Sequence, residues 1–151
     1  MKQMNKIETR KTRLSDIHAL YRGAVDKSIH DDEELFKDWA ITNVQRSTAF
    51  TCLHNGEPLA CAGIRFLPPA PVINAEVWAV FSVKAKKYIR YILRDLKEEL
   101  NIFVNKYKVE NVYADSRIGF PKSQRLLEHL GFKKLDITHN GYLRYKLTVK
   151  E

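Results

Sequence analysis

The chain has 151 residues, of which 44% are hydrophobic and 11% aromatic, so one ordinary domain can bury a core without disulfide or metal support. Its 26 lysines and arginines exceed its 18 aspartates and glutamates, and the net charge of +8 favours an acidic partner: a phosphorylated cofactor, a nucleic acid or a negatively charged protein surface. The two cysteines and five histidines show no metal-ligand spacing, which argues against a metal site and a disulfide framework.

The sequence also argues against a secreted or membrane-spanning protein. Its first 13 residues are polar and basic and contain no apolar stretch of the kind found in a secretory signal. The longest uninterrupted apolar run, residues 59–64, is far too short to cross a bilayer. We therefore expect a protein of the reducing cytoplasm without a membrane partner.

The N-terminal third predicts a strand followed by two helices. Residues 7–10 can form a short strand, and residues 14–17 supply a helix cap ahead of apolar residues at helical spacing. A second helix is expected at about 32–43. The acidic run 31–34 at its start either suits the positive end of the helix dipole or selects a cationic acceptor such as lysine or a polyamine.

The middle of the chain predicts three strands. Two antiparallel strands, 49–53 and 58–66, flank an Asn-Gly pair, which is the strongest short hairpin signal. Residues 67–74 contain three prolines and must form a loop. A compact apolar strand follows at 75–81 and leads through a short turn into a long helix.

That long helix carries an unusual charge pattern at its start. It runs to about Tyr107 on one continuous apolar stripe, yet basic residues occupy positions 84, 86, 87 and 90. Cations are unfavourable at a helix N-terminus, which already presents unpaired N–H groups and the positive end of the dipole. A bound phosphate would reverse that cost, because such an end is a common anion site. The alternative is an ordinary solvated helix face.

The C-terminal third predicts a strand, a helix and a final hairpin. The strand 109–114, joined to the previous strand by the long helix, completes a βαβ unit whose two strands are parallel. A helix that opens at Phe120-Pro121 ends at Gly131, where a left-handed cap is needed. Strands at 132–137 and 143–149 then form a hairpin.

The element order is therefore β-α-α-β-β-β-α-β-α-β-β in one α/β domain over residues 1–151. That order, with a helix that ends in Leu-Gly-Phe within residues 123–132, resembles the GNAT superfamily of acyl-CoA-dependent N-acetyltransferases. The resemblance implies a mixed, mostly antiparallel twisted sheet with a central βαβ unit and flanking helices. It implies acetyl-CoA as cofactor and transfer of an acetyl group to an amine of a small molecule or a protein, and it leaves the oligomeric state open.

The resemblance assigns cofactor binding to the turn after the fourth strand. In the superfamily, backbone N–H groups of a glycine-rich loop hold the pyrophosphate of coenzyme A there. By position, Lys84 replaces the first basic or amide residue and Ala85 is small, but Lys87 and Ile89 stand where Gly or Ala is usual. These side chains either crowd the pyrophosphate or, in the case of the lysine, replace backbone contacts with charge. The implied cofactor-binding residues are Phe81, Ser82, Val83, Lys84, Ala85, Lys86, Lys87 and Tyr88. The backbone of the first three would meet the pantetheine arm or the thioester carbonyl.

The closing helix departs from the superfamily pattern. Members often carry an Asn at the place of Phe120 and a Tyr, a frequent general acid toward the leaving thiolate, at the place of Leu127. An apolar Leu127 cannot protonate a thiolate. The lysine-rich turn after Val77-Trp78, together with the missing tyrosine, is similar to a small phage family of GNAT-like internal virion proteins, which would place the chain in the host cytoplasm.

Three residues are implied as catalytic. Glu76 stands at the start of the fourth strand, where GNAT-like enzymes often keep a base or a water-holding carboxylate, although a strand-end Glu is also common on surfaces. Asp115 and Ser116 are expected just past the fifth strand, near the opening of a cleft, or else as ordinary turn caps.

Three functions follow from the sequence as hypotheses. The first is acetyl-CoA-dependent acyl transfer to an amine, and the second is a catalytically silent GNAT-like fold used as a virion or assembly component. The third is nucleic-acid binding through residues 84–94, which is disfavoured because only Tyr88 and Tyr91 could serve there as aromatic platforms.

Overall fold

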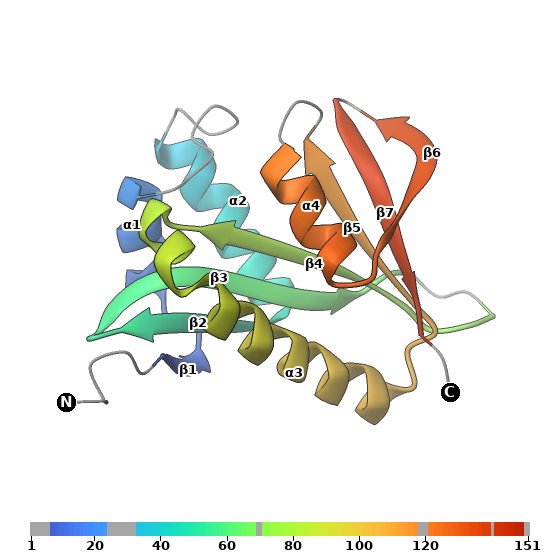
Figure 1. Ribbon diagram of the computed structural model, residues 1–151, viewed down its shortest axis with the longest axis horizontal. Helices are drawn as coiled ribbons and strands as arrows, with labels where there is room; N and C mark the ends of the chain where they lie inside the picture. The colour runs from blue at the N-terminus through green and yellow to red at the C-terminus, as the bar shows by residue number, and fades with distance from the viewer. Residues whose placement is uncertain (1–6, 24–32, 69–70, 118–120, 140, 150–151) are drawn as a thin grey trace. The chain divides into compact units, whose positions relative to one another are not determined.

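The structure, a computed structural model, describes residues 7–23, 33–68, 71–117, 121–139 and 141–149 (Figure 1). The sequence features at residues 31–32, Phe120 and Asn140 lie outside these ranges. The elements follow the predicted order, with one 3-10 helix (η2) added before the long helix. They are β1 (Glu8–Lys11), α1 (Leu14–Gly23), α2 (Glu33–Arg46), β2 (Thr48–His54), β3 (Glu57–Phe66), β4 (Asn74–Phe81), η2 (Val83–Tyr88), α3 (Ile89–Tyr107), β5 (Asn111–Arg117), α4 (Pro121–His129), β6 (Lys133–His139) and β7 (Tyr142–Thr148).

The strands form one mixed sheet in the order β1-β2-β3-β4-β5-β7-β6. Strands β4 and β5 are parallel, with Asn74 opposite Asn111 and Glu76 opposite Tyr113. The other pairings whose register the structure describes, β1 with β2, β2 with β3, β5 with β7 and β6 with β7, are antiparallel. Because α3 connects the two parallel strands, the predicted βαβ unit and the predicted fold class are both confirmed.

The chain divides into two compact units. One unit comprises Met1–Ile64 and Ala79–Glu98, and the other comprises Arg65–Trp78 and Glu99–Glu151. Strands β3 and β4 and helix α3 each run from one unit into the other. A single domain over the whole chain stays a prediction. None of the described helices is long and apolar enough to span a membrane.

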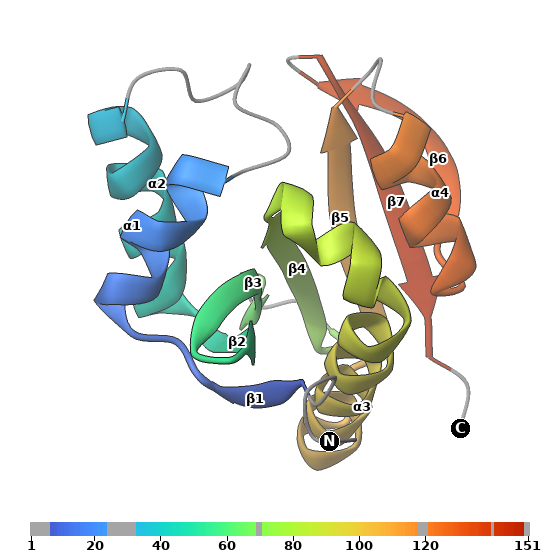
Figure 2. The ribbon, with the colours of Figure 1, turned by 60° about the vertical axis from the view of Figure 1, so that its left-hand side comes forward.

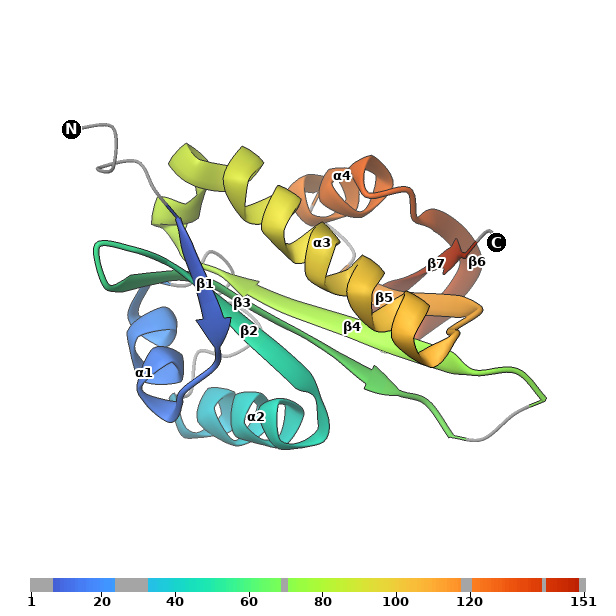
Figure 3. The same ribbon diagram turned by 90° about the horizontal axis from the view of Figure 1, so that it is seen from below.

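In the first unit, helices α1 and α2 pack side by side on one face of strands β1–β3, and the start of α3 lies over the other face (Figure 3). Each face has its own apolar cluster. Ile17 and Ala40 are buried on the side of α1 and α2, whereas Cys52, Leu59 and Ile92 are buried on the side of α3. The strands of this unit are therefore covered by helices on both faces.

Helix α1 begins at a buried carboxylate. Asp16, in the first turn, accepts hydrogen bonds from the Arg13 N–H at 2.8 Å and from two guanidinium nitrogens of Arg10 at 2.8 and 2.9 Å. Burial raises the pKa of Asp16, but hydrogen bonds from Arg10, from the Arg13 N–H and from Thr51 outweigh that effect, so the pKa lies below its ordinary value. The carboxylate thus caps the helix and pairs with a strand arginine.

Two turns have the backbone that the sequence predicted. Asn55 and Gly56 have φ angles of 51° and 78°, as a two-residue hairpin of type I′ requires. Gly131 has a φ of 97° and donates to the Glu128 carbonyl, while Phe132 N–H donates to the Leu127 carbonyl, each at 3.0 Å. This pair of hydrogen bonds is a Schellman motif, so the predicted glycine cap of α4 is confirmed.

In the second unit, α4 packs over β5 and β6 (Figure 2). The buried residues of β5 alternate with exposed or half-buried ones: Val112, Ala114 and Ser116 are buried, whereas Tyr113 and Asp115 are not. One face of this part of the sheet is thus apolar, and the other is polar.

Strand β5 is longer than predicted. It ends at Arg117 instead of Ala114, because it pairs with β7 as far as Arg117 opposite Tyr142. Asp115 and Ser116 therefore lie inside the strand, and their predicted position past its end is wrong. The stretch between β4 and α3 also differs from the expected short turn, because η2 occupies Val83–Tyr88.

Candidate functional site

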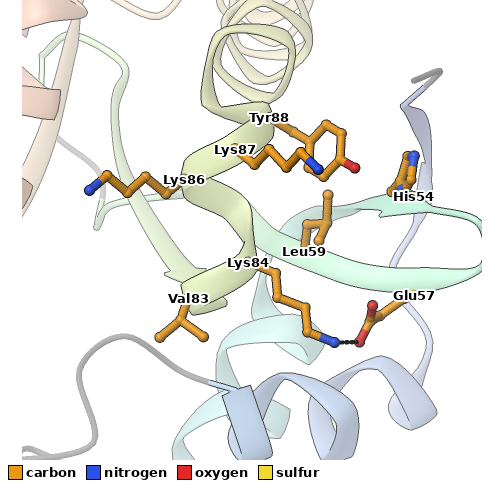
Figure 4. A pocket seen from close by; sticks show the side chains of 8 residues that line it. All are labelled: His54, Glu57, Leu59, Val83, Lys84, Lys86, Lys87 and Tyr88. Carbon is orange, nitrogen blue, oxygen red and sulfur yellow. Dashed lines mark hydrogen bonds and ion pairs between the residues drawn. The ribbon is translucent and has the colours of Figure 1, made fainter. Parts of the chain in front are cut away.

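A pocket of about 670 Å³ lies between the β2–β3 hairpin and η2 in the first unit (Figure 4). Its lining residues are His54, Glu57 and Leu59 from the hairpin, and Val83, Lys84, Lys86, Lys87 and Tyr88 from η2. Five of the eight cofactor-binding residues implied by the resemblance are therefore brought together around one cavity.

The pocket is basic. Three lysines and one glutamate line it, and the Nζ atom of Lys84 lies 2.8 Å from Glu57 Oε2. Both of these side chains are more than half exposed, so the ion pair is accessible to solvent and weak. Lys87 places its Nζ atom 5.8 Å from the centre of the Tyr88 ring. The surplus of ammonium groups favours an anionic ligand.

The pocket also has an aromatic surface. The rings of His54 and Tyr88 are stacked, with centroids 4.4 Å apart and planes inclined by 26°. Figure 4 shows Lys87 and Tyr88 on the His54 side of η2, whereas Lys86 extends away from it. Leu59, which is 1% exposed, supplies a buried apolar contact beside the rings. Rings and cations at one place suit a ligand with a flat heterocycle and phosphates.

The backbone of the turn offers fewer open donors than the resemblance implied. Ser82 N–H donates to the Leu59 carbonyl at 2.8 Å, Lys84 N–H donates to Ser82 Oγ at 3.2 Å, and Ala85 N–H donates to the Ser82 carbonyl at 2.9 Å. Ala85 is buried in the core cluster with Cys52 and Ile92, so core packing accounts for its small size. A phosphate at this turn would be held by lysine side chains and not by these three amides.

Two of the other implied cofactor residues, Phe81 and Ser82, face the core. Phe81 packs against the apolar cluster, and Ser82 is 5% exposed and serves as the N-cap of η2. Neither lines the pocket, so each could reach a ligand only through its backbone. Val83 is 59% exposed and adds an apolar edge to the pocket.

In the second unit, two of the implied catalytic residues, Glu76 and Asp115, are joined by Arg144. Arg65 donates to Glu76 Oε1 from Nη2 at 2.6 Å and from Nε at 3.2 Å. Arg144 Nη1 donates to Glu76 Oε2 at 3.3 Å and to the two Asp115 oxygens at 3.0 and 3.2 Å. The Arg144 guanidinium also lies 4.7 Å from the centre of the Tyr113 ring.

These contacts form a half-buried charge network. The side chains of Glu76 and Arg144 are 19% and 26% exposed, and that of Asp115 is 40% exposed. Charge-assisted hydrogen bonds of this kind fix the orientation of a carboxylate. Ser116 does not join the network, because the strand turns its side chain to the opposite face, where it is 1% exposed.

Arg65, Arg144, His54 and Glu57 were not predicted as site residues from the sequence. The only signal for Arg144 was its alternation with apolar residues on the last strand, which places it on the polar face. Its partners depend on the register in which Asp115 lies opposite Arg144, and register is a long-range property.

Cys61 is not among the residues that line the pocket. Burial raises the pKa of the Cys61 thiol to about 11, and its sulfur lies 3.2 Å from the Thr12 hydroxyl. A thiol held neutral in the core is not a nucleophile. Within the ranges that the structure describes, no three His, Cys, Asp or Glu side chains are grouped so that they could hold a metal ion.

No protein-family model matches the sequence and no curated protein matches it either, so neither comparison supports the resemblance to phage internal virion proteins. Solved structures are similar over nearly the whole chain. A protein from Pyrococcus horikoshii has a TM-score of 0.77 at 14% identity, over 97% of this chain and 100% of that one. A GNAT-family acetyltransferase from Bacillus anthracis has a TM-score of 0.63 at 18% identity, over 94% of each chain. A Salmonella typhimurium protein solved with its cofactor acetyl-CoA has a TM-score of 0.64 at 14% identity, over 96% of this chain and 95% of that one. The chain therefore has the GNAT N-acetyltransferase fold.

Proposed function

We propose that this protein is an N-acyltransferase that takes an acetyl group from acetyl-CoA and passes it to an amine of a small molecule or a protein. The main observation behind the proposal is a lysine-lined pocket between η2 and the β2–β3 hairpin in a GNAT fold. When bound, acetyl-CoA supplies an acetyl group activated as a thioester.

The residues of η2 fit the phosphates of this cofactor through charge. Three of the six residues of η2 are exposed lysines: Lys84, Lys86 and Lys87. The only carboxylate in the pocket lining is that of Glu57, and it forms an ion pair with Lys84. Flexible ammonium groups can contact a pyrophosphate without the close backbone approach that a glycine-rich loop permits. Lysine side chains would thus take the place of the Lys84 and Ala85 amides, which already donate hydrogen bonds to Ser82.

Glu76 is the proposed acceptor of the proton that the amine must lose. A general base must reach the proton and must be held in a fixed orientation, and Arg65 and Arg144 bind its two oxygens from strands β3 and β7. Asp115 shares Arg144 and can hold the ammonium form of the acceptor beside Glu76. Because Leu127 has no acidic hydrogen, the leaving thiolate would take its proton from solvent or from another side chain.

A catalytically silent member of the fold, used as an assembly component, is the second candidate. One observation favours it: both carboxylate oxygens of Glu76 already accept hydrogen bonds from arginines. A carboxylate in that state can be a structural ion pair as readily as a base.

Two measurements separate these candidates. In a thermal unfolding experiment, acetyl-CoA should raise the midpoint in proportion to the logarithm of its concentration, as ligand linkage requires. The doubly substituted variant Lys84→Glu, Lys87→Glu should lose most of this shift and keep the midpoint of the free protein. No shift at saturating acetyl-CoA would contradict cofactor binding.

Turnover is then measured as release of free thiol from acetyl-CoA in the presence of an amine panel: lysine, spermidine and a peptide with a free N-terminus. Acyl transfer predicts thiol release that requires an amine, together with a mass increase of the acceptor by one acetyl group. Binding of acetyl-CoA without any amine-dependent release would support the silent fold instead.

A further inference from the structure

The guanidinium of Arg144 uses only one of its nitrogens on the two carboxylates beside it. All three of its hydrogen bonds, one to Glu76 and two to Asp115, come from Nη1. Arg65 behaves differently, because it places the edge formed by Nε and Nη2 on a single oxygen of Glu76. Within the ranges that the structure describes, Nε and Nη2 of Arg144 donate to no protein acceptor, so one edge of this guanidinium is left for a ligand.

A second cation lies on the same polar face of the sheet. Lys146 follows Arg144 by two positions on β7, so both side chains lie on the face opposite to that of the buried Tyr145. The Arg144 guanidinium lies 4.7 Å from the centre of the Tyr113 ring, and the Lys146 Nζ atom lies 6.0 Å from it. Directly opposite Lys146 on β6 is Lys133, and two like charges in that position are unfavourable. A bound anion would reduce this repulsion.

The charges of this face favour a ligand with a single negative charge. The network of Glu76, Asp115, Arg65 and Arg144 is neutral as a whole, and Lys146 beside it adds one positive charge. The Arg144 side chain is 26% exposed, so its attraction for an anion is screened less than that of a fully exposed group. The free edge of a guanidinium fits a carboxylate, because two N–H groups can donate to its two oxygens in parallel.

We propose that Arg144 and Lys146 bind a carboxylate of the acceptor, and that the acceptor is a free α-amino acid. This inference rests on the proposed function and names the substrate class of the same site. Arg144 Nη1 lies 3.3 Å from Glu76 Oε2, so the base and the carboxylate site share one guanidinium. The acceptor must therefore carry its amine and its carboxylate close together, as an α-amino acid does. A polyamine has no carboxylate, and the N-terminal amine of a protein has no free carboxylate beside it.

Each end of the amino acid then has its own partners. The ammonium group lies on the Nη1 side of Arg144, where Glu76 and Asp115 supply negative charge and Glu76 accepts the proton. The carboxylate lies on the Nη2 side and is shared with Lys146. Contact with the Tyr113 ring restricts both cations, so less side-chain freedom is lost when the carboxylate binds.

Thiol release from acetyl-CoA, measured with matched acceptors, tests the inference. The panel pairs free amino acids with their amides, which keep the α-amine and the side chain and lose the carboxylate. We expect kcat/KM for the amino acids that react to be at least about tenfold higher than for their amides, the scale of a lost hydrogen bond between charged groups. Equal or higher kcat/KM for the amides would overturn the inference and leave the proposed function standing.

Calorimetric titration of the same acceptors, with coenzyme A present, gives a measurement that does not depend on turnover. The amino acids that bind should do so at least about tenfold more tightly than their amides. If they bind in this way and no amine releases thiol, the proposed function fails and the carboxylate site is supported. If no amino acid of the panel binds or is acetylated, the carboxylate site is overturned.

Two variants separate binding of the carboxylate from support of Glu76. Lys146→Gln should raise KM for amino acids about threefold, the scale of a solvent-accessible ion pair, and leave KM for the amides unchanged. Arg144→Lys keeps the charge but loses the guanidinium edge, so it should raise KM for amino acids by about tenfold and that for the amides much less. Lys134→Gln is the control, because Lys134 lies opposite Tyr145 and so on the other face of the sheet. A KM that rises equally for amino acids and amides in both variants would show a structural role alone and would overturn the assignment.

Discussion

Lys84 and Glu57 form an ion pair across the pocket, with 2.8 Å between the ammonium nitrogen and the nearer carboxylate oxygen (Figure 4). One residue belongs to η2 and the other begins β3, 27 positions earlier in the chain. The contact means that an anionic ligand must compete with a resident carboxylate for one of the three lysines. Glu57 therefore weakens the pocket for the ligand that the lysines favour.

This competition gives the first prediction. Glu57→Gln removes the competing charge and should tighten coenzyme A binding by about threefold, the scale of an exposed ion pair, while Lys84→Gln should weaken it by a similar factor. In the double variant Glu57→Gln, Lys84→Gln, the substitution of Glu57 should no longer change the affinity for coenzyme A, because position 84 then carries no ammonium group for Glu57 to pair with. Calorimetric titration measures all four states, and Glu98→Gln, an exposed carboxylate on α3, is the control. Unchanged affinity in Glu57→Gln would show that the pair does not compete with the ligand.

The second prediction concerns the proposed base. Glu76→Gln should lower amine-dependent thiol release by about 10²–10⁴-fold, the usual contribution of a general base, and should leave acetyl-CoA affinity unchanged. Asp136→Asn, an exposed carboxylate on β6, should leave both quantities unchanged. A Glu76→Gln variant with full turnover would remove Glu76 from the mechanism and leave the ion pairs to Arg65 and Arg144 as its only role.

The third prediction follows from the buried carboxylate of Asp16. Because the pKa of Asp16 is lower in the folded protein than in the unfolded chain, its contribution to stability is present above the unfolded value of about 3.9 and is lost as the pH falls through the folded value. Asp16→Asn should cost about 2 kcal/mol of unfolding free energy at neutral pH, since charged hydrogen bonds to Arg10 are lost.

Urea unfolding at a series of pH values measures the loss of unfolding free energy that Asp16→Asn causes. The difference between the natural protein and Asp16→Asn should narrow as the pH falls below 4, and the exposed Asp38→Asn should show no such difference. Parallel stability curves for the natural protein and Asp16→Asn would contradict the assignment.

The fourth prediction concerns the core thiol of Cys61. Burial raises its pKa to about 11, against an ordinary value of 9.0. The neutral thiol contributes to the free energy of unfolding fully at a pH below its pKa in the unfolded chain, and this contribution is lost as the pH rises through its pKa in the folded protein. The protein should therefore become less stable between about pH 9 and pH 11. At pH 8, alkylation of Cys61 should be at least about 100-fold slower in the folded protein than in denaturant, because a much smaller fraction is thiolate and the side chain is only 2% exposed. Peptide mass spectrometry reads Cys61 and Cys52 separately, and equal rates in both states would contradict the prediction.

Features that depend on neighbouring residues were predictable from the sequence. The Asn55-Gly56 turn and the Gly131 cap each need a positive φ, and few residues accept one, so their positions marked the hairpin and the end of α4. The apolar stripe of α3 and the compact apolar run at 75–81 likewise identified the βαβ unit and with it the fold class.

Features that depend on register were not predictable. Asp115 was expected past the end of β5, because nothing in the local sequence shows that Arg144 lies opposite it and continues the pairing. The basic residues at 84, 86 and 87 suggested an anion site from the sequence, but the contact of Lys84 with Glu57 requires knowing which part of the hairpin lies beside them. Likewise, Ser82 was expected to meet the cofactor through its backbone, and its capping of η2 became visible only in the fold.

Ser82 has a consequence for the pocket as a whole. Through its N–H it is tied to Leu59 on β3, and through its hydroxyl and carbonyl oxygens it is tied to the amides of Lys84 and Ala85. Ser82 thus connects, by hydrogen bonds, the β2–β3 hairpin and η2, the two elements that carry the cationic and aromatic side chains of the pocket. The backbone of the cavity is preorganised, and the entropy lost on association comes mainly from the long side chains themselves.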